Sequence, residues 1–274
     1  MSRIVVLGDL NVDIVAVQET ALAVDSDTPA RVSLRPGGGG ANVAAWLGRL
    51  GADVTLIGRV GTDPLAEVAL RALDGVELAV TRDPERPTGT CIVLVAPGGG
   101  RTMLPDPGAN DALSADELPT LAGDVLHVSG YTLLRRGSRA AAMAAIERAR
   151  AAGMKISVDP ASAAPLANDP VFLDRIAPVD LLLPNADEVA ALGATRGAAQ
   201  VVAKSGAGGA TWTDGVETVH AAAPVVDVVD TTGAGDAFAA GFLSAWLEGG
   251  PEAALQAGVR CAAEVVTRVG SRPA

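Results

Sequence analysis

Short apolar runs alternate with helical segments along most of this 274-residue chain. Apolar runs of three to four residues that end at polar or glycine positions are typical of strands buried in a parallel sheet. Strand, helix and strand in series predict an α/β fold: a doubly wound, mostly parallel sheet flanked by helices, in a single domain over residues 1–274. Predicted strands cover residues 4–7, 54–57, 125–128, 156–158, 181–183 and 201–203, and predicted helices cover 43–50, 65–73, 139–152, 236–248 and 251–269.

Two segments depart from this alternation, approximately residues 12–34 and 88–104. The first contains the alternating stretch Ala-Arg-Val-Ser-Leu, and the second contains Cys-Ile-Val-Leu-Val followed by a Pro-Gly-Gly-Gly turn and Arg101. Alternation and glycine-rich turns indicate antiparallel hairpins that leave the main sheet. The pattern alone does not distinguish hairpins with a role from surface hairpins without one.

Charge and composition exclude several classes of protein. The chain has 21 basic and 32 acidic residues, a formal net charge of −11, which disfavours a nucleic-acid partner. No apolar run approaches the ~18 residues of a membrane span, and the N-terminus lacks the pattern of a secretory signal. Cys91 and Cys261 lie far apart, without the spacing of a metal or disulfide framework. These features predict a reduced, cytoplasmic protein.

The first glycine-rich segment is Pro-Gly-Gly-Gly-Gly-Ala-Asn, residues 36–42, directly before a predicted helix. Consecutive glycines allow backbone N–H groups to approach a ligand closely. The segment is neither a G-x-G-x-x-G dinucleotide fingerprint nor a P-loop, which argues against a nucleotide-binding oxidoreductase. Taken alone, it is also compatible with a flexible turn.

The second glycine-rich segment, Asp-Thr-Thr-Gly-Ala-Gly-Asp-Ala-Phe over residues 230–238, is more specific. Three successive N–H groups at a helix N-terminus form a pocket for an anion. A carboxylate beside it, Asp236, can accept a proton from a hydroxyl while the N–H groups stabilise a transferring phosphoryl group. The alternative is that Asp236 only complements the helix dipole.

The two glycine-rich segments, in this order and separation, resemble the signature motifs of the ribokinase-like (PfkB-type) carbohydrate kinase family. The resemblance covers essentially the whole chain and includes Gly-Asp-Leu-Asn-Val-Asp at residues 8–13 and Asn-Ala-Asp-Glu at 185–188. It implies an ATP- and Mg²⁺-dependent kinase that phosphorylates a hydroxymethyl group of a sugar or sugar-like alcohol. It also implies that the two hairpin segments form a small β-sheet lid over the substrate, through which two copies could pair as a homodimer.

The resemblance also assigns roles to individual positions. The catalytic group comprises the general base Asp236 and the anion hole of Gly233, Ala234 and Gly235. The substrate group comprises Asn11, Asp13, Gly38, Gly39, Asn42 and Asp230. The nucleotide group comprises Asn185, Glu188, Lys204, Gly206 and Gly208, with Glu188 organising Mg²⁺ through water. A K⁺ site is implied beside the anion hole, formed mostly by backbone carbonyls, at Asp230, Thr232, Val265, Arg268 and Gly270.

Several of these residues also have a purely structural interpretation. Asn185 and Glu188 fit a polar helix cap, and Lys204 fits a solvated lysine at a strand end. Gly39 stands where many ribokinases have a lysine, and Arg101 in the lid turn is a candidate for that missing charge, or else an exposed lid arginine. His127 and His220 have no ligand partner at metal spacing and are interpreted as structural.

The resemblance and the residues together favour a neutral, ribose- or fructose-like sugar as the substrate. Relatives that bind an acidic sugar place an arginine after the strand at residues 156–158, and this chain has none there. A nucleoside kinase of the same fold is the alternative, although one Tyr, three Trp and three Phe leave few aromatics for stacking on a base. A catalytically silent sugar-binding relative is the second alternative, which the intact Asp236 and glycine turn argue against.

Overall fold

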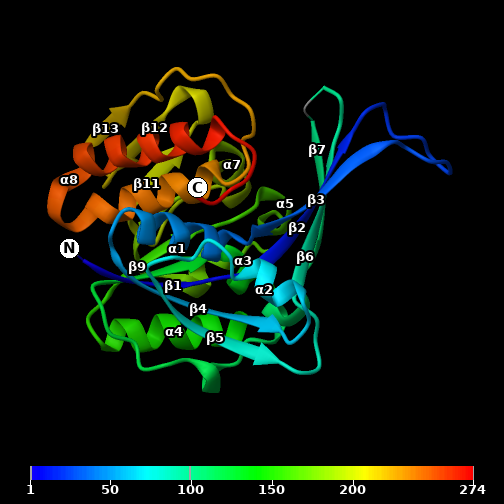
Figure 1. The fold of residues 1–274 in the computed structure, drawn as a ribbon. Coiled ribbons are helices and arrows are strands. Elements are labelled where there is room, and N and C mark those ends of the chain that lie inside the picture. The colour runs from blue at the N-terminus through cyan, green and yellow to red at the C-terminus, as the bar shows by residue number, and fades with distance from the viewer. Residues whose placement is uncertain (1, 99, 274) are drawn as a thin grey trace.

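The computed structural model describes residues 2–98 and 100–273, and within them one large sheet forms the centre of the molecule (Figure 1). Its strand order is β13-β12-β11-β10-β9-β8-β1-β4-β5, and all pairs are parallel except that β12 is antiparallel to both β11 and β13. The prediction of a doubly wound, mostly parallel sheet is therefore confirmed. The strands are β1 (Arg3–Leu7), β4 (Asp53–Gly61), β5 (Val76–Asp83), β8 (Val125–Ser129), β9 (Lys155–Asp159), β10 (Val179–Leu182), β11 (Ala198–Lys204), β12 (Ala210–Thr213) and β13 (Thr218–Ala221).

Helices cover both faces of this sheet. On one face, α1 (Gly39–Arg49) packs against α8 (Ala234–Val266), and on the other lies α4 (Arg139–Ala151), as Figure 1 shows. The aromatic side chains of Trp46, Phe238 and Phe242 are buried between α1, α8 and the sheet. Shorter helices complete the layers: α2 (Leu65–Ala69), α3 (Gly130–Leu134), α5 (Ala163–Leu166), α6 (Phe172–Ile176) and α7 (Ala186–Leu192), with 3-10 turns at Gly108–Ala112, Ala115–Glu117 and Gly206–Gly208.

Two predicted helices are shorter in the structure than the sequence indicates. The helix expected over 65–73 ends at Ala69, because the chain turns at Ala72, which has a φ of 52°. The helix expected to reach residue 269 ends at Val266, whose carbonyl accepts from the N–H groups of Val229 and Asp230. The break predicted between residues 248 and 251 is present as a kink at Gly250 (φ 73°, ψ 177°).

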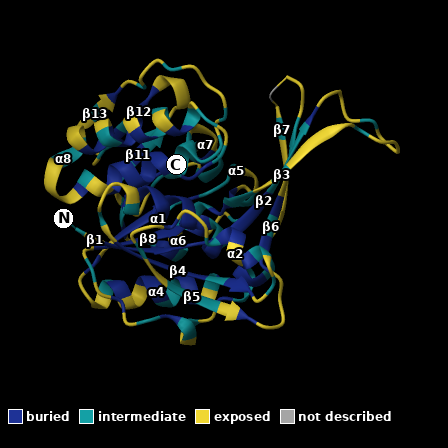
Figure 2. Cartoon of the chain, in the orientation of Figure 1, coloured by how far each residue is buried: buried dark blue, intermediate teal, exposed yellow. Residues whose placement is uncertain are grey.

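A second, four-stranded sheet projects from one side of the body (Figure 1). It consists of β2 (Asn11–Gln18), β3 (Ala30–Gly37), β6 (Gly89–Val95) and β7 (Arg101–Asp106), in the order β3-β2-β6-β7. Each hairpin is antiparallel as expected, but the central pair β2 and β6 is parallel, so the lid sheet is mixed. Its tips are largely exposed in Figure 2. Below, this four-stranded sheet is called the lid.

The functional groups gather where the parallel strands end. Asp9 follows β1, Ser129 and Asp159 are the last residues of β8 and β9, Asn185 follows β10, and Lys204 ends β11. In open α/β sheets, ligands bind at this carboxyl edge. The lid begins at the same edge, because β2 follows β1 after three residues. The fold therefore brings the lid hairpins, the glycine-rich segments and the strand ends to one place.

Candidate active site

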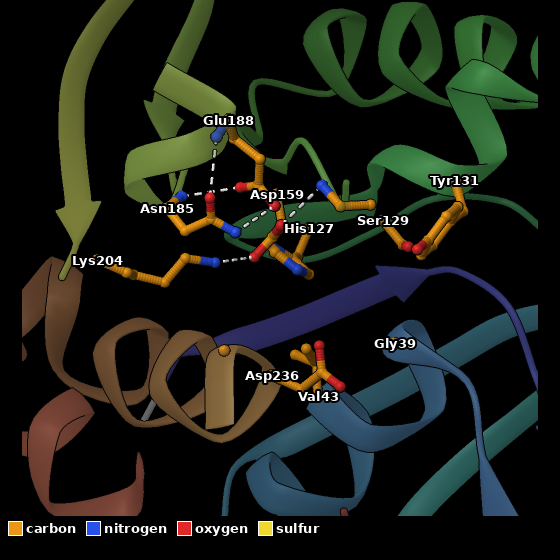
Figure 3. Close-up of a pocket in the computed structure, with 12 residues that line it drawn as sticks. Gly39, Val43, His127, Ser129, Tyr131, Asp159, Asn185, Glu188, Lys204 and Asp236 are labelled. Atoms are coloured by element: carbon orange, nitrogen blue, oxygen red, sulfur yellow. Dashed lines mark hydrogen bonds and ion pairs between the residues drawn. The ribbon is translucent and has the colours of Figure 1, made fainter. Parts of the chain in front are cut away.

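A cavity of about 140 Å³ opens at the carboxyl edge of the main sheet (Figure 3). It joins the two glycine-rich segments to side chains from the ends of four strands. The lining residues are Gly39, Val43, His127, Ser129, Tyr131, Asp159, Ala161, Asn185, Glu188, Lys204, Gly235 and Asp236. Of the predicted catalytic positions, Gly235 and Asp236 line this cavity, whereas Gly233 and Ala234 do not. The predicted nucleotide positions Asn185, Glu188 and Lys204 line it as well.

Asp236 lies in the first turn of α8 and faces this cavity. The Asn42 Nδ2 donates to its Oδ2 at 2.8 Å. Burial raises the pKa of Asp236 to about 7, and the carboxylates of Asp159 and Asp9 add to this, while Asn42 and Lys204 oppose it. A carboxyl group with a pKa near neutrality is suited to accept and return a proton at physiological pH.

The turn before Asp236 contains a residue in the left-handed backbone region. Gly233 caps α8 with a φ of 76°, and a Cβ there would lie 2.5 Å from the Ser271 Cβ. Only glycine adopts this conformation without strain and fits this space. Gly235 is adjacent to the Lys204 ammonium, since a Cβ on Gly235 would lie 3.4 Å from Nζ. The helix N-terminus and a lysine cation therefore converge on the same part of the cavity.

On the far side of the cavity, four residues form paired polar contacts (Figure 3). The Lys204 Nζ donates to the Asp159 Oδ2 at 2.6 Å, and the pair is largely buried. Burial alone would lower the pKa of Lys204, but Asp159 and Glu188 outweigh it and raise the pKa. The lysine is therefore a fixed cation inside the cavity, and the alternative of a solvated lysine at a strand end is wrong.

Asn185 and Glu188 form a capping box at the N-terminus of α7. The Asn185 N–H donates to Glu188 Oε2 at 2.8 Å, and the Glu188 N–H donates to Asn185 Oδ1 at 2.9 Å. Burial and the nearby Asp159 raise the pKa of Glu188. Both residues also line the cavity, so the helix cap and the functional position coincide. Gly206 and Gly208, by contrast, lie in an exposed turn after Lys204 and are not among the residues that line the cavity.

The polar groups here fit Mg²⁺ held through water and phosphate. Among residues 2–98 and 100–273, no group of three or more His, Cys, Asp or Glu side chains is arranged to hold a metal directly. The cavity does present the carboxylates of Asp159 and Glu188. Mg²⁺ usually keeps several waters and binds through one or two carboxylates plus substrate phosphates. This donor set is therefore compatible with a nucleotide-bound Mg²⁺.

A second, narrower pocket lies between the lid and the body. It contains several of the predicted substrate and cation positions, and its lining is Asp13, Val15, Arg35, Pro36, Val93, Val95, Arg101, Asp230, Thr232, Gly270 and Ser271. Asp13 is buried, and burial together with Asp9 raises its pKa to about 6. A Cβ on Gly37 would lie 2.5 Å from the Asp13 carboxylate, so the glycine before the helix is required by this close approach.

Arg101 joins the lid to the body. Its Nη2 lies 2.7 Å from the Asp230 Oδ1, and its Nη1 donates to the Thr231 hydroxyl at 2.9 Å. Asp230 also accepts from the backbone N–H groups of Thr232 (2.8 Å) and Gly270 (3.1 Å). Although burial opposes it, these hydrogen bonds and Arg101 lower the pKa of Asp230. Arg101 is thus an ion-paired residue of the site and not a solvated lid arginine.

The predicted K⁺ positions are only partly brought together. Asp230, Thr232 and Gly270 line the lid pocket, but Val265 and Arg268 are not among its lining residues. The Val265 carbonyl accepts from the Arg268 N–H, and the Arg268 guanidinium stacks over Trp46, 5.5 Å from the ring centroid. The donors around Asp230 are N–H groups and a guanidinium. A K⁺ ion bound to Asp230 would therefore share that carboxylate with Arg101.

Among the other substrate positions, Gly39 lies beside Asp236, and Gly38 and Asn11 lie at the base of the lid. Gly39 is so close that a Cβ there would lie 3.5 Å from Asp236 Oδ1. Gly38 has a φ of 93°, which lets the chain pass from β3 into α1. Asn11 accepts from the Asn110 Nδ2 at 2.9 Å and donates to Asp9 at 3.0 Å, so its amide is fixed at the lid base.

Sequence reasoning missed several residues of the site. Asp9, Ser129 and Asp159 each come at or directly after the end of a strand, which is the signal that could have found them. Arg272 and Ser271 follow α8 and have no motif of their own. His127, interpreted as structural, also lines the cavity; burial lowers its pKa to about 4, and its Nδ1 lies 3.1 Å from the Ser157 Oγ, so it is a neutral packing residue.

This combination of a doubly wound sheet, a β lid and an aspartate at a glycine-capped helix N-terminus defines a small-molecule kinase. The model of the pfkB family carbohydrate kinases matches residues 1–274. The chain belongs to this family and is a carbohydrate kinase, of the group that acts on sugars and nucleosides. Among residues 2–98 and 100–273, no helix is long and apolar enough to cross a bilayer.

Individual relatives agree with the family assignment. The chain is 34% identical to an ATP-dependent ribose-1-phosphate kinase of Halopiger xanaduensis, over 100% of this chain and 95% of the relative. It is 31% identical to a fructokinase of Vibrio alginolyticus, over 89% and 84% of the two chains. An E. coli protein described as ribokinase II, solved in complex with ATP and Mg²⁺, superposes with a TM-score of 0.84 at 24% identity, covering 99% of this chain and 94% of that one.

Proposed function

We propose that this chain transfers the γ-phosphoryl group of ATP, with Mg²⁺, to a hydroxymethyl group of a neutral ribose- or fructose-like sugar. The observation that carries the proposal is the position of Asp236, a carboxyl group with a pKa of about 7 that faces the main cavity beside the glycine turn. The lid pocket lies nearby, because Asp230 and Thr232 of that pocket precede the same turn. The proton acceptor and the anion-binding turn therefore lie between the main cavity and the lid pocket.

Each side chain then has a role in an in-line transfer. Asp236 accepts the proton of the sugar hydroxyl as the oxygen attacks phosphorus. The N–H groups of the turn at Gly233, Ala234 and Gly235, with the Lys204 cation, stabilise the charge on the transferring group. ATP supplies that group, and Mg²⁺, when bound, neutralises its phosphate oxygens near Asp159 and Glu188.

The nucleotide is assigned to the main cavity and the sugar to the lid pocket. The main cavity holds the paired lysine and the two carboxylates suited to phosphate and Mg²⁺. The lid pocket holds Asp13, a buried hydrogen-bonding carboxyl group, and the arginine that closes the lid. In this assignment, the ATP- and Mg²⁺-bound relative and the fructokinase support the donor and the sugar class.

A nucleoside acceptor and a silent binder are less well supported. The apolar lining of the lid pocket is Val15, Val93 and Val95, with no aromatic ring for a base to stack on among its described residues. The intact Asp236 and glycine turn argue against a protein that only binds a sugar.

A second candidate is a sugar that already carries a phosphate. Arg35 and Arg101 both line the lid pocket, and the Arg35 Nε is buried without a hydrogen-bond partner among the described residues. Two arginines in one pocket can bind a phosphate group together through charge-assisted hydrogen bonds. The ribose-1-phosphate kinase relative favours the same class.

The experiment is a coupled ADP-release screen with Mg²⁺-ATP over free pentoses, free hexoses, their monophosphates and nucleosides. The neutral-sugar proposal expects the highest kcat/KM with a free pentose or hexose. Preference for a sugar monophosphate would establish the second candidate instead. Turnover with none of these compounds would contradict the proposed function.

We also propose that two copies pair through the lid. Leu34, Ile14, Ile92 and Leu104 occupy one register row across all four lid strands, on the face opposite Asp13, and three of them are exposed by 42–51%. Sedimentation of the wild type and of Leu34→Glu tests the pairing, with a dimer expected only for the wild type. A monomeric wild type at micromolar concentration would contradict it. ATP use and the free thiols of Cys91 and Cys261 support a cytoplasmic location.

A further inference from the structure

The segment after α8, residues 267–273, returns to the active site and buries a charged side chain beside it. Arg272 is only 7% exposed. Its Nη2 donates to the Gly37 carbonyl at 2.8 Å, its Nη1 donates to the Arg71 carbonyl, and its Nε donates to the Asn42 Oδ1 at 3.4 Å. Burial of a guanidinium is costly, which implies that these three contacts fix its position closely.

Asn42 receives two donors from this segment at one end of its amide. Its Oδ1 accepts from the Ser271 hydroxyl at 3.0 Å and from the Arg272 Nε at 3.4 Å. The other end, Nδ2, donates to the Asp236 Oδ2 at 2.8 Å. A primary amide has one accepting and one donating end. Donors on Oδ1 therefore require the NH₂ group to face Asp236.

The opposite amide orientation would place a carbonyl oxygen against the Asp236 carboxylate. It would also leave the buried Arg272 Nε, which can only donate, facing an NH₂ group. The Ser271 hydroxyl could accept from that NH₂ group, but its own proton would then lose the Asn42 Oδ1 as acceptor. Asp236 does not decide the orientation alone, because in its protonated form it could donate to a carbonyl. Arg272 therefore determines the orientation of the amide, and the Ser271 hydroxyl supports it.

We propose that Ser271 and Arg272 are positioning residues that hold the Asn42 amide with its NH₂ group on Asp236, and thereby keep the Asp236 carboxylate ionised and ready to accept a proton. This inference rests on the proposed role of Asp236 as the base. Neither residue needs to touch the phosphoryl group. Their effect on catalysis is transmitted by the side-chain amide of Asn42 in α1.

The charged surroundings show why the amide matters. Donation to the ionised form of a carboxyl group favours that form, whereas neighbouring carboxylates disfavour it. Asp9 and Asp159 raise the pKa of Asp236, and Asn42 and Lys204 lower it. The titratable and charged groups around Asp236 are Asp9 after β1, His127 in β8, Tyr131 in α3, Asp159 in β9, Glu188 in α7, Lys204 in β11 and Arg272 after α8.

Ser271→Ala and Arg272→Met, each in the wild-type and the Asn42→Ala background, test the proposal. The readouts are the acid-limb pKa of kcat and the pKa of Asp236 from ¹³C-carboxyl NMR without substrates. We expect each single variant to raise both values, by about 0.3–1 pH unit. In the Asn42→Ala background, we expect Ser271→Ala to shift neither pKa. Arg272→Met should still raise both, but by less than half as much, because loss of the Arg272 cation itself also disfavours the ionised carboxylate.

Arg49→Met is the matched control. Arg49 bridges α1 to Glu264 of α8 at 2.7 Å and stacks on Trp46, so it shares the packing of this region, but it lies at the opposite end of α1 from Asn42. We expect no shift of either pKa in this variant. Ser271→Ala keeps the Cβ and the buried guanidinium, so it tests the proposal even if Arg272→Met does not fold.

Three results would overturn the inference: no shift in Ser271→Ala, a Ser271→Ala shift that persists without Asn42, or an Arg272→Met shift that is undiminished there. The NMR titration does not depend on turnover. If Asp236→Asn retained activity, the proposed base would be wrong, while the titration would still decide whether these residues orient the amide.

Discussion

The two sides of the active site differ in how their charges are satisfied. On the nucleotide side, Lys204 is paired with Asp159 at 2.6 Å, and Asn185 and Glu188 bond to each other. On the lid side, an ion pair between Arg101 and Asp230 at 2.7 Å connects the lid to the segment before α8, and the Arg35 Nε is without a hydrogen-bond partner among the described residues. The contacts of the nucleotide side lie within the body of the molecule, whereas the lid side depends on a contact between the lid and the body.

This difference suggests that one side of the site is fixed in advance and that the other is completed when the sugar binds. Groups at the ends of neighbouring parallel strands are held by the ladder itself and need no ligand to fix them. The outer lid strands β3 and β7 are exposed along much of their length (Figure 2). We therefore expect changes on the nucleotide side to affect the transition state, and changes on the lid side to affect mainly sugar binding.

The largest effect is expected from Lys204→Met. Removal of the cation should reduce kcat/KM for ATP by about 10²- to 10³-fold, because charge on the transferring phosphoryl group loses a fixed partner. Sugar affinity, measured calorimetrically, should change less than about twofold. Lys155→Met is the control, since this exposed lysine pairs with Asp180 at the start of the neighbouring strands. A loss of sugar affinity as large as the loss of kcat/KM for ATP would contradict the division of the site into two functionally separate sides.

A smaller effect is expected on stability. Burial raises the pKa of Asp236 from 3.8 to about 7, so the folded state binds a proton more tightly than the unfolded state. The unfolding free energy should therefore fall as pH rises from about 4 to 7, and Asp236→Asn should abolish this part of the fall. Because Asp236 opens onto the cavity, we expect the variant to be more stable than the wild type at pH 8 by only about 2 kcal/mol. Urea unfolding of the wild type and of Asp236→Asn at pH 5 and 8 measures this difference in unfolding free energy. Equal stabilities of the two proteins at pH 8 would contradict the raised pKa.

Arg101→Met tests the lid side. Loss of the bridge to Asp230 should raise KM for the sugar by about tenfold and leave KM for ATP within about twofold. The control is Arg31→Met, an exposed lid arginine on β3. If KM for ATP rose as much as KM for the sugar, the bridge would serve the whole site and the two sides would not be separable.

The smallest effect is expected from K⁺. Because Asp230 already accepts from Arg101 and two backbone N–H groups, we expect K⁺ to raise kcat only about two- to threefold over tetramethylammonium at matched ionic strength. Steady-state rates in the two salts measure the effect. Equal rates would mean that Arg101 and the backbone hold the loop without a cation.

Local patterns predicted the parts of the site that are local in sequence. The glycine turn and Asp236 lie within four residues, so one motif contains both the strained backbone and the base. The doubly wound sheet followed from short apolar runs at regular intervals. The strands β5, β12 and β13, at the two ends of the sheet, were not predicted, because they are only partly buried and lack a continuous apolar run.

Contacts between distant segments could not be predicted in this way. The pair of Lys204 and Asp159, which lie 45 residues apart in the sequence, depends on how the strands are arranged in the sheet. The parallel pairing of β2 with β6 depends on how two hairpins dock, which neither hairpin encodes. Arg272 lies 230 residues from Asn42, and an isolated arginine after a helix is usually solvated.

The most direct test of the whole account is turnover of Asp236→Asn with ATP, Mg²⁺ and the sugar found in the ADP-release screen. The account predicts that kcat falls by at least about 10²-fold, because the proton acceptor is lost. It also predicts that sugar and ATP affinities, measured by calorimetry, stay within about tenfold, because the base acts mainly in the transition state. Retention of more than a tenth of the wild-type rate would contradict the assignment of Asp236 as the base.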